Sequence, residues 1–242
     1  MPVFKNEIYT AHFDSNQFVV GGGVAIFHLA TSRVVICRCV YRGQTIYFLP
    51  KGRRDAGEES GPGAEREGYE ECIDVIKKSG YRNRLLPLPT VHRQPQAHSR
   101  IHASPQTAEP VCMQLLPLAT RQYIIYWYIA ETLPPDLETL LETEAGEAYK
   151  PPPPYPQNLS LRERIEHEPE GYEPRHHENT GVDELEVTYV SELVSVEEAV
   201  QRLGGEGSMG KIMADVVETG WMGIQRRFEM ENAATHESPE AV

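Results

Sequence analysis

Acidic side chains gather on one face of a predicted helix in the first third of the chain. On a helical wheel, four of them fall within roughly 100° of each other: Glu67, Glu70, Glu71 and Asp74. Like charges at this spacing cost roughly a few tenths of a kcal/mol per pair, and no Lys or Arg stands among them. Because carboxylate oxygens are preferred ligands of Mg²⁺, the pattern indicates either a solvated acidic face or a site for divalent cations.

Basic side chains flank this acidic face on both sides. One group precedes the helix and another follows it: Lys51, Arg53 and Arg54, then Arg82, Arg84, Arg93 and Arg100. Residues 81–100 contain no acid. Guanidinium groups bind phosphate oxygens, and carboxylates bind hard divalent cations. This alternation of charge therefore favours a site where metal ions and phosphates meet over a merely solvated surface.

The segment from Gly52 to Glu71 resembles the signature of the Nudix hydrolases, G-x5-E-x7-R-E-U-x-E-E-x-G-U, where U is a bulky aliphatic residue. Six fixed positions match at the right spacing: Gly52, Glu58, Arg66, Glu67, Glu70 and Glu71. By average residue usage, a chance match in such a chain has a probability on the order of 10⁻⁵. The resemblance implies an enzyme in which water attacks a phosphoanhydride bond.

The resemblance also implies a role for each matched residue. The metal-binding and catalytic carboxylates would be those of Glu67, Glu70 and Glu71, holding Mg²⁺ or Mn²⁺, with the carbonyl oxygen of Gly52 as a further ligand. Glu67 is the candidate for the base that orients or deprotonates water. A structural ion pair is implied between Glu58 and Arg66. A further ligand or base outside the signature has three candidates, among which the sequence does not choose: Glu173, Glu178 and Glu184.

The basic residues near the signature favour a small, phosphate-rich substrate. The candidate phosphate ligands are Lys51, Arg53, Arg54, Arg82 and Arg84. A diphosphoinositol polyphosphate or a dinucleoside polyphosphate would suit them. The predicted activity is thus a metal-dependent pyrophosphohydrolase. The alternative is a catalytically weak Nudix-fold binding or scaffold protein, whose acidic, proline-rich segment recruits a protein partner.

Two departures from the signature motivate this alternative. Gly68 occupies the first bulky aliphatic position, where glycine weakens a helix by about 1 kcal/mol relative to alanine. The residues after Glu71 also fail to match, but the family ending returns at 79–81 if Cys72 to Lys78 are skipped. We therefore hypothesise an insertion of seven residues, which adds nearly two helical turns and is either tolerated or damaging to activity.

Runs of β-branched and aromatic residues predict the strands, which are expected at 17–29, 33–40, 45–49, 110–116, 121–131 and 183–190. Helices are expected at about 62–78 with Ser60 as the N-cap, at 195–204 with Ser195 as the cap, and at about 208–230. This order predicts an α/β fold with a mixed β-sheet, and the resemblance implies a Nudix-type α/β/α sandwich interrupted by one long insertion.

The insertion is expected at residues 132–178. It holds eleven acids against four Lys and Arg, together with nine prolines, a composition typical of disorder, with one short helix near 137–147. The expected organisation is a single domain over residues 1–230, with residues 231–242 as a flexible tail.

Overall charge and hydropathy exclude several other classes. A net charge of −13 disfavours a broad nucleic-acid surface. The longest apolar run, 123–130, is far shorter than the roughly 18 residues that cross a bilayer, so no membrane association is expected. The beginning of the chain lacks a secretory h-region, and four scattered cysteines indicate a reducing compartment. We expect a cytoplasmic protein, with the nucleus as a further location.

Overall fold

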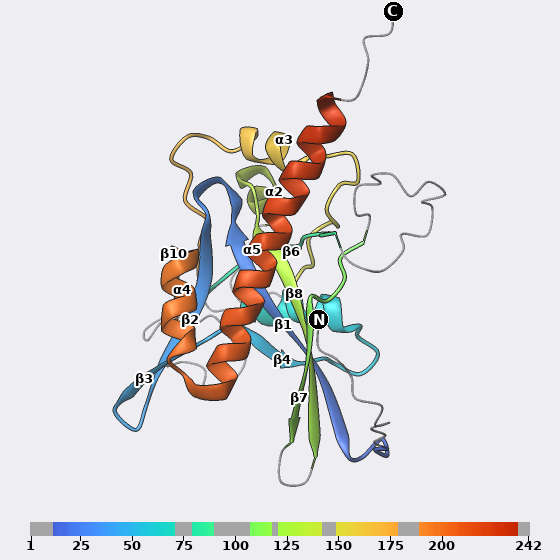
Figure 1. Ribbon diagram of the computed structural model, residues 1–242, viewed down its shortest axis with the longest axis vertical. Coiled ribbons are helices and arrows are strands. Elements are labelled where there is room, and N and C mark those ends of the chain that lie inside the picture. The colour runs from blue at the N-terminus through green and yellow to red at the C-terminus, as the bar shows by residue number, and fades with distance from the viewer. Residues whose placement is uncertain are drawn as a thin grey trace, which may run out of the picture.

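An eight-stranded mixed β-sheet forms the centre of the molecule in the computed structural model (Figure 1). The structure describes residues 12–70, 79–89, 107–117, 121–141, 149–178 and 189–236. The strands of this sheet are β1 (Phe18–His28), β2 (Arg33–Tyr41), β3 (Gln44–Phe48), β4 (Lys51–Arg53), β6 (Asn83–Leu85), β7 (Cys112–Pro117), β8 (Gln122–Thr132) and β10 (Val190–Ser195). The central path runs β10-β2-β1-β8-β6, with β3 on β2, β4 on β1 and β7 on β8.

The pairing of β1 with β8 holds this sheet together. The two strands are parallel over ten residue pairs, from Phe18 opposite Gln122 to Phe27 opposite Glu131, whereas the other pairings are antiparallel. A second, two-stranded sheet pairs β5 (Ser79–Tyr81) with β9 (His176–Glu178). The fold is therefore mixed α/β, as the sequence predicts.

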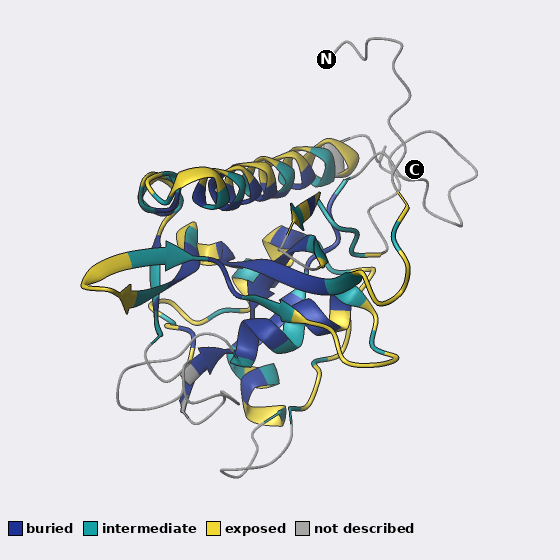
Figure 2. Ribbon diagram, turned by 90° about the horizontal axis from the view of Figure 1, so that it is seen from below, coloured by how far each residue is buried: buried dark blue, intermediate teal, exposed yellow. Residues whose placement is uncertain are grey.

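Helices cover both faces of the sheet (Figure 2). They are α1 (Ser60–Glu70), α2 (Pro135–Leu140), α3 (Leu161–Glu166), α4 (Val196–Gly204) and α5 (Gly207–His236), with a 3-10 turn at Leu29–Thr31. Alternate residues of β1 serve the two faces. Val24 and Ile26 pack in the core with Ala64 of α1, whereas Ala25 and Phe27 pack in the larger core that α5 covers.

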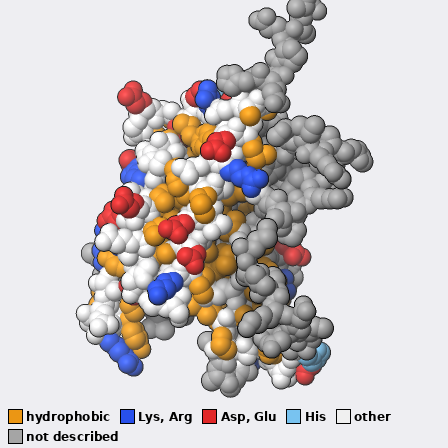
Figure 3. All heavy atoms as spheres, in the orientation of Figure 1, with side chains coloured by type: hydrophobic (Ala, Val, Ile, Leu, Met, Phe, Trp, Pro, Cys, Tyr) orange, Lys and Arg blue, Asp and Glu red, His pale blue; other side chains and the backbone are white. Residues whose placement is uncertain are grey.

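The helix at the end of the chain packs through one stripe of its surface. Four apolar residues of this stripe are buried: Met213, Val216, Val217 and Ile224. Acidic, basic and hydrophobic side chains are interspersed over the face that carries α5 (Figure 3). Among the helices of the described residues, none combines the length and apolar character needed to span a membrane.

Residues 132–178 correct the expectation of a disordered insertion. Where the structure describes them, at 132–141 and 149–178, they form α2, α3 and β9 and contribute fully buried side chains. Leu133, Tyr155 and Leu161 are each 5% exposed or less. Composition misled because few apolar residues are present, yet these few lie in the core, and a capping box at Ser160 fixes α3.

Other boundaries differ in smaller ways. The first helix begins at Ser60 itself, and the hydroxyl of Ser60 pairs with that of Tyr128 at 2.8 Å. The predicted extension of this helix through residues 71–78, and the hypothesised insertion within it, lie outside the described residues. The strand predicted at 183–190 lies largely outside them too, and β10 runs from Val190 to Ser195. Ser195 caps α4 as predicted, accepting the N–H of Glu198.

Candidate functional site

A run of three glycines in β1 allows α1 to lie close to the sheet. A Cβ on Gly22 would be 2.7 Å from the backbone nitrogen of Ala64, so no larger residue fits beneath the helix. On the opposite face, a Cβ on Gly23 would overlap the ring of Trp127. Glycine is therefore required here by the approach of neighbouring groups on both faces of one strand.

Gly68, the departure from the signature, has a similar cause. A Cβ at this position would be 2.6 Å from Nδ2 of Asn83 and 2.9 Å from Cγ1 of Val24. Asn83 is held there because its Nδ2 donates to the carbonyl oxygen of Glu65 at 2.9 Å. The bulky aliphatic residue of the signature would not fit, so glycine at 68 belongs to the packing between α1 and the sheet.

Glu67 lies directly over Gly52. Gly52 is the middle residue of β4 and pairs with Gly22 of β1, and a Cβ on Gly52 would overlap the carboxylate of Glu67. The helix brings Glu67 to this strand because Ala64, one turn earlier, is seated on Gly22. Two residues that lie fifteen positions apart in sequence are thus packed against each other, and Glu67 is 8% exposed.

Arg66 connects the carboxylates of the signature. Its Nε and Nη2 donate to the two carboxylate oxygens of Glu58, each at 3.1 Å. Its Nη1 lies 2.6 Å from Oε2 of Glu70 and 2.8 Å from Oε1 of Glu67. Nη2 also donates to the carbonyl oxygen of Arg53 at 2.9 Å, which ties the helix to β4. We call Arg66, Glu58, Glu67 and Glu70 the Arg66 cluster.

The electrostatics of the Arg66 cluster follow from one cation facing three carboxylates. Burial alone would raise the pKa of Glu58, but hydrogen bonds from Arg66 and from the N–H of Asp55 outweigh it and lower that pKa. Burial would lower the pKa of Arg66, yet hydrogen bonding to Glu58 and the charges of Glu67 and Glu70 raise it. Glu58 and Arg66 are therefore both held in their charged forms, and the cluster sets one guanidinium against three carboxyl groups.

The basic residues predicted to bind phosphate separate into two groups. Arg54 lies beside the Arg66 cluster, where its Nη1 donates to the carbonyl oxygen of Glu58 at 3.1 Å, and the carbonyl oxygen of Arg53 accepts from Arg66. Nζ of Lys51 instead lies 5.9 Å from the centre of the Phe48 ring. Arg53 and Arg54 are exposed. The structure does not bring Arg82 and Arg84 to this surface.

Arg82 and Arg84 are each 2% exposed. The guanidinium of Arg82 stacks on Tyr69 at 4.8 Å. The guanidinium of Arg84 pairs with Glu131 and stacks on Tyr155 at 4.8 Å. Sequence alone groups them with the other arginines because it does not show that their side chains face the interior, or which distant acid or aromatic ring they meet.

Of the remaining predicted acids, Glu71 and Glu184 lie outside the described residues. Glu173 accepts hydrogen bonds from Arg33 at 2.8 and 2.7 Å on the surface, and Glu178 forms part of β9 beside β5. Within the described ranges, no group of three or more His, Cys, Asp or Glu side chains is arranged to hold a metal ion. Gly52, Glu67 and Glu70 nevertheless provide hard oxygen donors of the type that Mg²⁺ and Mn²⁺ prefer.

Glu65 is a further titratable residue of α1 that sequence reasoning did not select. Burial raises its pKa to about 7, although the N–H of Leu85, which donates at 2.7 Å, and the charge of Arg84 oppose this shift. Its place next to Arg66 was visible in the sequence. Its burial was not, because it depends on how β6 packs against the helix.

The chain resembles solved structures distantly. A Nudix hydrolase from Nitrosomonas europaea is 11% identical with a TM-score of 0.43, covering 85% of this chain and 89% of that one. The E. coli ORF135 protein is 9% identical with a TM-score of 0.39, covering 96% of this chain and 100% of its own. No family model and no curated protein sequence matches. Such similarity carries no argument about activity, which must rest on the residues themselves.

Proposed function

We propose that the protein is a divalent-metal-dependent hydrolase of the Nudix type, cleaving a phosphoanhydride bond in a small, phosphate-rich substrate. A diphosphoinositol polyphosphate and a dinucleoside polyphosphate are the substrate classes to test first. The observation that carries the proposal is the position of Glu67 over Gly52, with Glu70 one turn further along α1. The spacing of the signature and the packing of the helix thus converge on the same oxygen donors.

Each residue of the Arg66 cluster has a place in this proposal. Glu67 and Glu70 would hold Mg²⁺ or Mn²⁺ together with Glu71 and the carbonyl oxygen of Gly52. When bound, the metal would neutralise charge on the diphosphate and increase the acidity of water. Arg66 orients the two carboxylates, since its Nη1 contacts both. Glu58 in turn fixes Arg66.

The chain's own groups would also handle the proton and the substrate. Glu67 would orient the attacking water and accept its proton, because its carboxylate lies over Gly52 and is positioned by Nη1 of Arg66. Arg53 and Arg54 are exposed beside the cluster and would meet phosphate oxygens that the metal leaves free. Neutralisation of charge and positioning account for most of the catalysis of phosphoryl transfer.

Chromatographic separation of the cleavage products from a substrate panel tests the proposal, because hydrolysis of a dinucleoside polyphosphate yields two nucleotides and no free phosphate. The panel comprises dinucleoside polyphosphates, diphosphoinositol polyphosphates and nucleoside diphosphate conjugates, each with and without Mg²⁺ or Mn²⁺. Glu70→Gln and Glu71→Gln should each lower kcat/KM by about 100-fold or more with little change in fold. The matched control is Glu59→Gln, since Glu59 is exposed, precedes the helix and is not part of the signature.

The results of this panel distinguish the hydrolase from the binding or scaffold protein. Activity that requires the metal and is lost in Glu70→Gln but kept in Glu59→Gln supports the hydrolase. Absence of activity in the parent on all substrates, together with binding of one of them, would favour the binding or scaffold protein. Activity unaffected by Glu70→Gln and Glu71→Gln would contradict the assignment of these carboxylates.

A further inference from the structure

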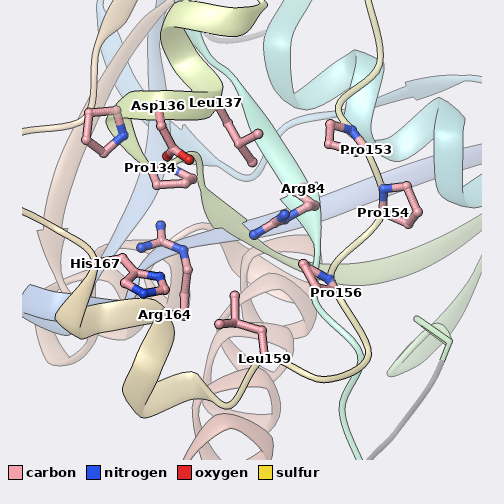
Figure 4. Close-up of a pocket in the computed structure, with 11 residues that line it drawn as sticks. Arg84, Pro134, Asp136, Leu137, Pro153, Pro154, Pro156, Leu159, Arg164 and His167 are labelled. Carbon is pink, nitrogen blue, oxygen red and sulfur yellow. The ribbon is translucent and has the colours of Figure 1, made fainter.

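A pocket outside the Arg66 cluster is lined by two buried arginines. It has a volume of about 540 Å³ and lies where α2, α3 and the proline-rich segment 153–156 come together (Figure 4). The guanidinium groups of Arg84 and Arg164 both extend toward its centre, and Pro134, Leu137 and Leu159 are among its apolar wall. This volume is in the range of small-molecule sites, roughly 300–1,000 Å³.

The two arginines share one carboxylate. Arg84 pairs with Oε1 of Glu131, and Nε of Arg164 lies 2.8 Å from Oε2 of the same residue, which is fully buried. The second carboxylate, Glu168, accepts from Nη2 of Arg164 at 2.8 Å and lies 3.2 Å from Nε2 of His28. We call Arg84, Arg164, Glu131 and Glu168 the Arg164 cluster.

The donors of Arg164 exceed the acceptors around it. Its Nη2 is shared between Glu168 and the carbonyl oxygen of Thr132, at 3.1 Å. Its Nη1 is buried and has no hydrogen-bond partner among the described residues, in a side chain that is 2% exposed. A guanidinium N–H without an acceptor costs free energy when it is buried, and a charge-assisted bond to an oxyanion would recover that cost.

The rest of the pocket indicates what kind of molecule the anion belongs to. Apolar side chains and proline rings form most of the wall, and the volume exceeds what a single oxyanion fills. His167 and Asp136 lie exposed among the lining residues. The carboxylate of Asp136 would repel an anion, so replacing Asp136 tests whether the pocket prefers a negatively charged ligand.

We propose that this pocket binds a small organic molecule through one oxyanion group, phosphate or carboxylate, with Nη1 of Arg164 as the donor and the proline-rich wall against its apolar part. Guanidinium groups present donors in a fork that matches both oxyanions. The site is separate from the Arg66 cluster. Arg164 pairs with Glu131 of β8. Glu131 is on the same face of β8 as Ile125, Trp127 and Ile129, which is the face that α5 covers.

Calorimetric titration of the full chain in metal-free buffer tests this proposal. The probes share a benzene ring and differ in the polar group: phenyl phosphate, benzoate and neutral benzamide. One or both anions should bind with saturation at one site, at least about tenfold more tightly than benzamide, because a charge-assisted bond replaces a neutral one. The two anions distinguish a phosphate site from a carboxylate site.

Two pairs of variants locate the binding. Asp136→Asn should tighten binding of the anion by about twofold to fivefold by removing a repelling charge, whereas Asp215→Asn on the exposed side of α5 should leave it unchanged. Arg164→Lys keeps the positive charge but loses the fork, so it should weaken binding by about tenfold or more. Thermal unfolding checks that each variant is folded. If Arg164→Lys does not fold, the comparison of Asp136→Asn with Asp215→Asn tests the proposal.

The opposite results would overturn the proposal. Absence of saturable binding of both anions would do so, as would binding of benzamide equal to that of phenyl phosphate and benzoate. Equal affinity in Asp136→Asn and Asp215→Asn would place any anion outside this pocket. None of these results depends on whether the Arg66 cluster hydrolyses phosphoanhydrides.

Discussion

Arg66 on α1 closely contacts three carboxylates and lies 3.9 Å from a fourth, that of Asp55. Arg164 on α3, in contrast, shares one carboxylate with Arg84 and a second with His28. In the Arg66 cluster the acceptors are in excess. In the Arg164 cluster Nη1 of Arg164 has no hydrogen-bond partner among the described residues, whereas Oε2 of Glu131 and Oε2 of Glu168 lie at ion-pair distance from Arg164 and His28. The same residue types therefore favour a cation at one site and an oxyanion at the other.

Burial separates the two clusters as well. The side chains of Arg66 and Glu70 are each 16% exposed, whereas those of Arg164 and Glu131 are 2% and 0% exposed. Water therefore screens the first cluster more than the second. The comparison indicates that the Arg66 cluster can exchange a protein contact for a ligand at little cost to the fold, while the Arg164 cluster supports the fold itself.

Removing one carboxylate from each cluster should produce the largest contrast in stability. Glu131→Gln should lower the free energy of unfolding by about 3–5 kcal/mol, because it leaves two buried guanidinium groups without their shared charge. Glu58→Gln should cost only about 1 kcal/mol, because Arg66 keeps Glu67 and Glu70 and is partly solvated. Denaturation by urea at neutral pH measures both. Equal losses would contradict the distinction drawn from burial.

A methyl group at Gly52 should break the Arg66 cluster without removing any charge. Gly52→Ala would force the carboxylate of Glu67 away from β4, so the proposed hydrolase should lose about 100-fold in kcat/KM. The control is Gly204→Ala at the end of α4, where an added Cβ meets nothing within 4 Å, and activity should be unchanged there. Full activity in Gly52→Ala would show that the contact between Glu67 and Gly52 is not needed.

The Arg66 cluster was predictable in part, because its members lie within thirteen positions, 58–70, and the resemblance implies the pair of Glu58 with Arg66. The contacts of Arg66 with Glu67 and Glu70 were not predicted, since the helical wheel placed no Lys or Arg among these acids. The hairpin of β1 and β2 was predictable for the same reason, since the pattern of β-branched residues is local. Gly68 looked like a defect in the signature because the sequence does not show that Asn83 of β6 lies against it.

The Arg164 cluster was not predictable from sequence. Arg84, Glu131 and Arg164 come from three elements separated by more than thirty residues each, so no spacing rule connects them. Composition also worked against it, since Arg164 belongs to a segment whose acids and prolines are typical of disorder. The few apolar residues that hold this segment, such as Leu161, decide its structure although they barely change its mean hydropathy.

Glu65 provides a pH-dependent test within the same helix. Its pKa is raised to about 7 from an ordinary value of 4.5, so the folded state keeps a proton that the unfolded state loses. The stabilisation is fully present below pH 4.5 and is lost as pH rises to about 7, with a total change of about 3 kcal/mol. Glu65→Gln mimics the protonated form and should be more stable than the parent at pH 8 by this amount.

Urea denaturation of Glu65→Gln and the parent between pH 5 and pH 8 measures the difference. The two proteins should have similar stability near pH 5 and diverge as pH rises. Glu59→Gln, which alters an exposed acid just before the helix, should run parallel to the parent. If Glu65→Gln also runs parallel to the parent, Glu65 is ionised in the fold and its burial is compensated by Arg84.

The smallest expected effect concerns how closely α1 lies on the sheet, on which the position of the Arg66 cluster depends. Replacing glycine by alanine inside a helix should add about 1 kcal/mol of stability. At Gly61 the new methyl group would meet Cδ1 of Leu85 at 3.1 Å, the end of a side chain that can move, so the variant should be neutral or slightly more stable.

At Gly68 the methyl group would meet Asn83, whose amide is hydrogen-bonded to the carbonyl oxygen of Glu65 and cannot move away without losing that bond. Gly68→Ala should therefore lower the free energy of unfolding by about 1 kcal/mol, opposite in sign to Gly61→Ala. A gain in stability for both variants would mean that α1 can move away from the sheet at no cost. Packing would then not fix the contact between Glu67 and Gly52 either.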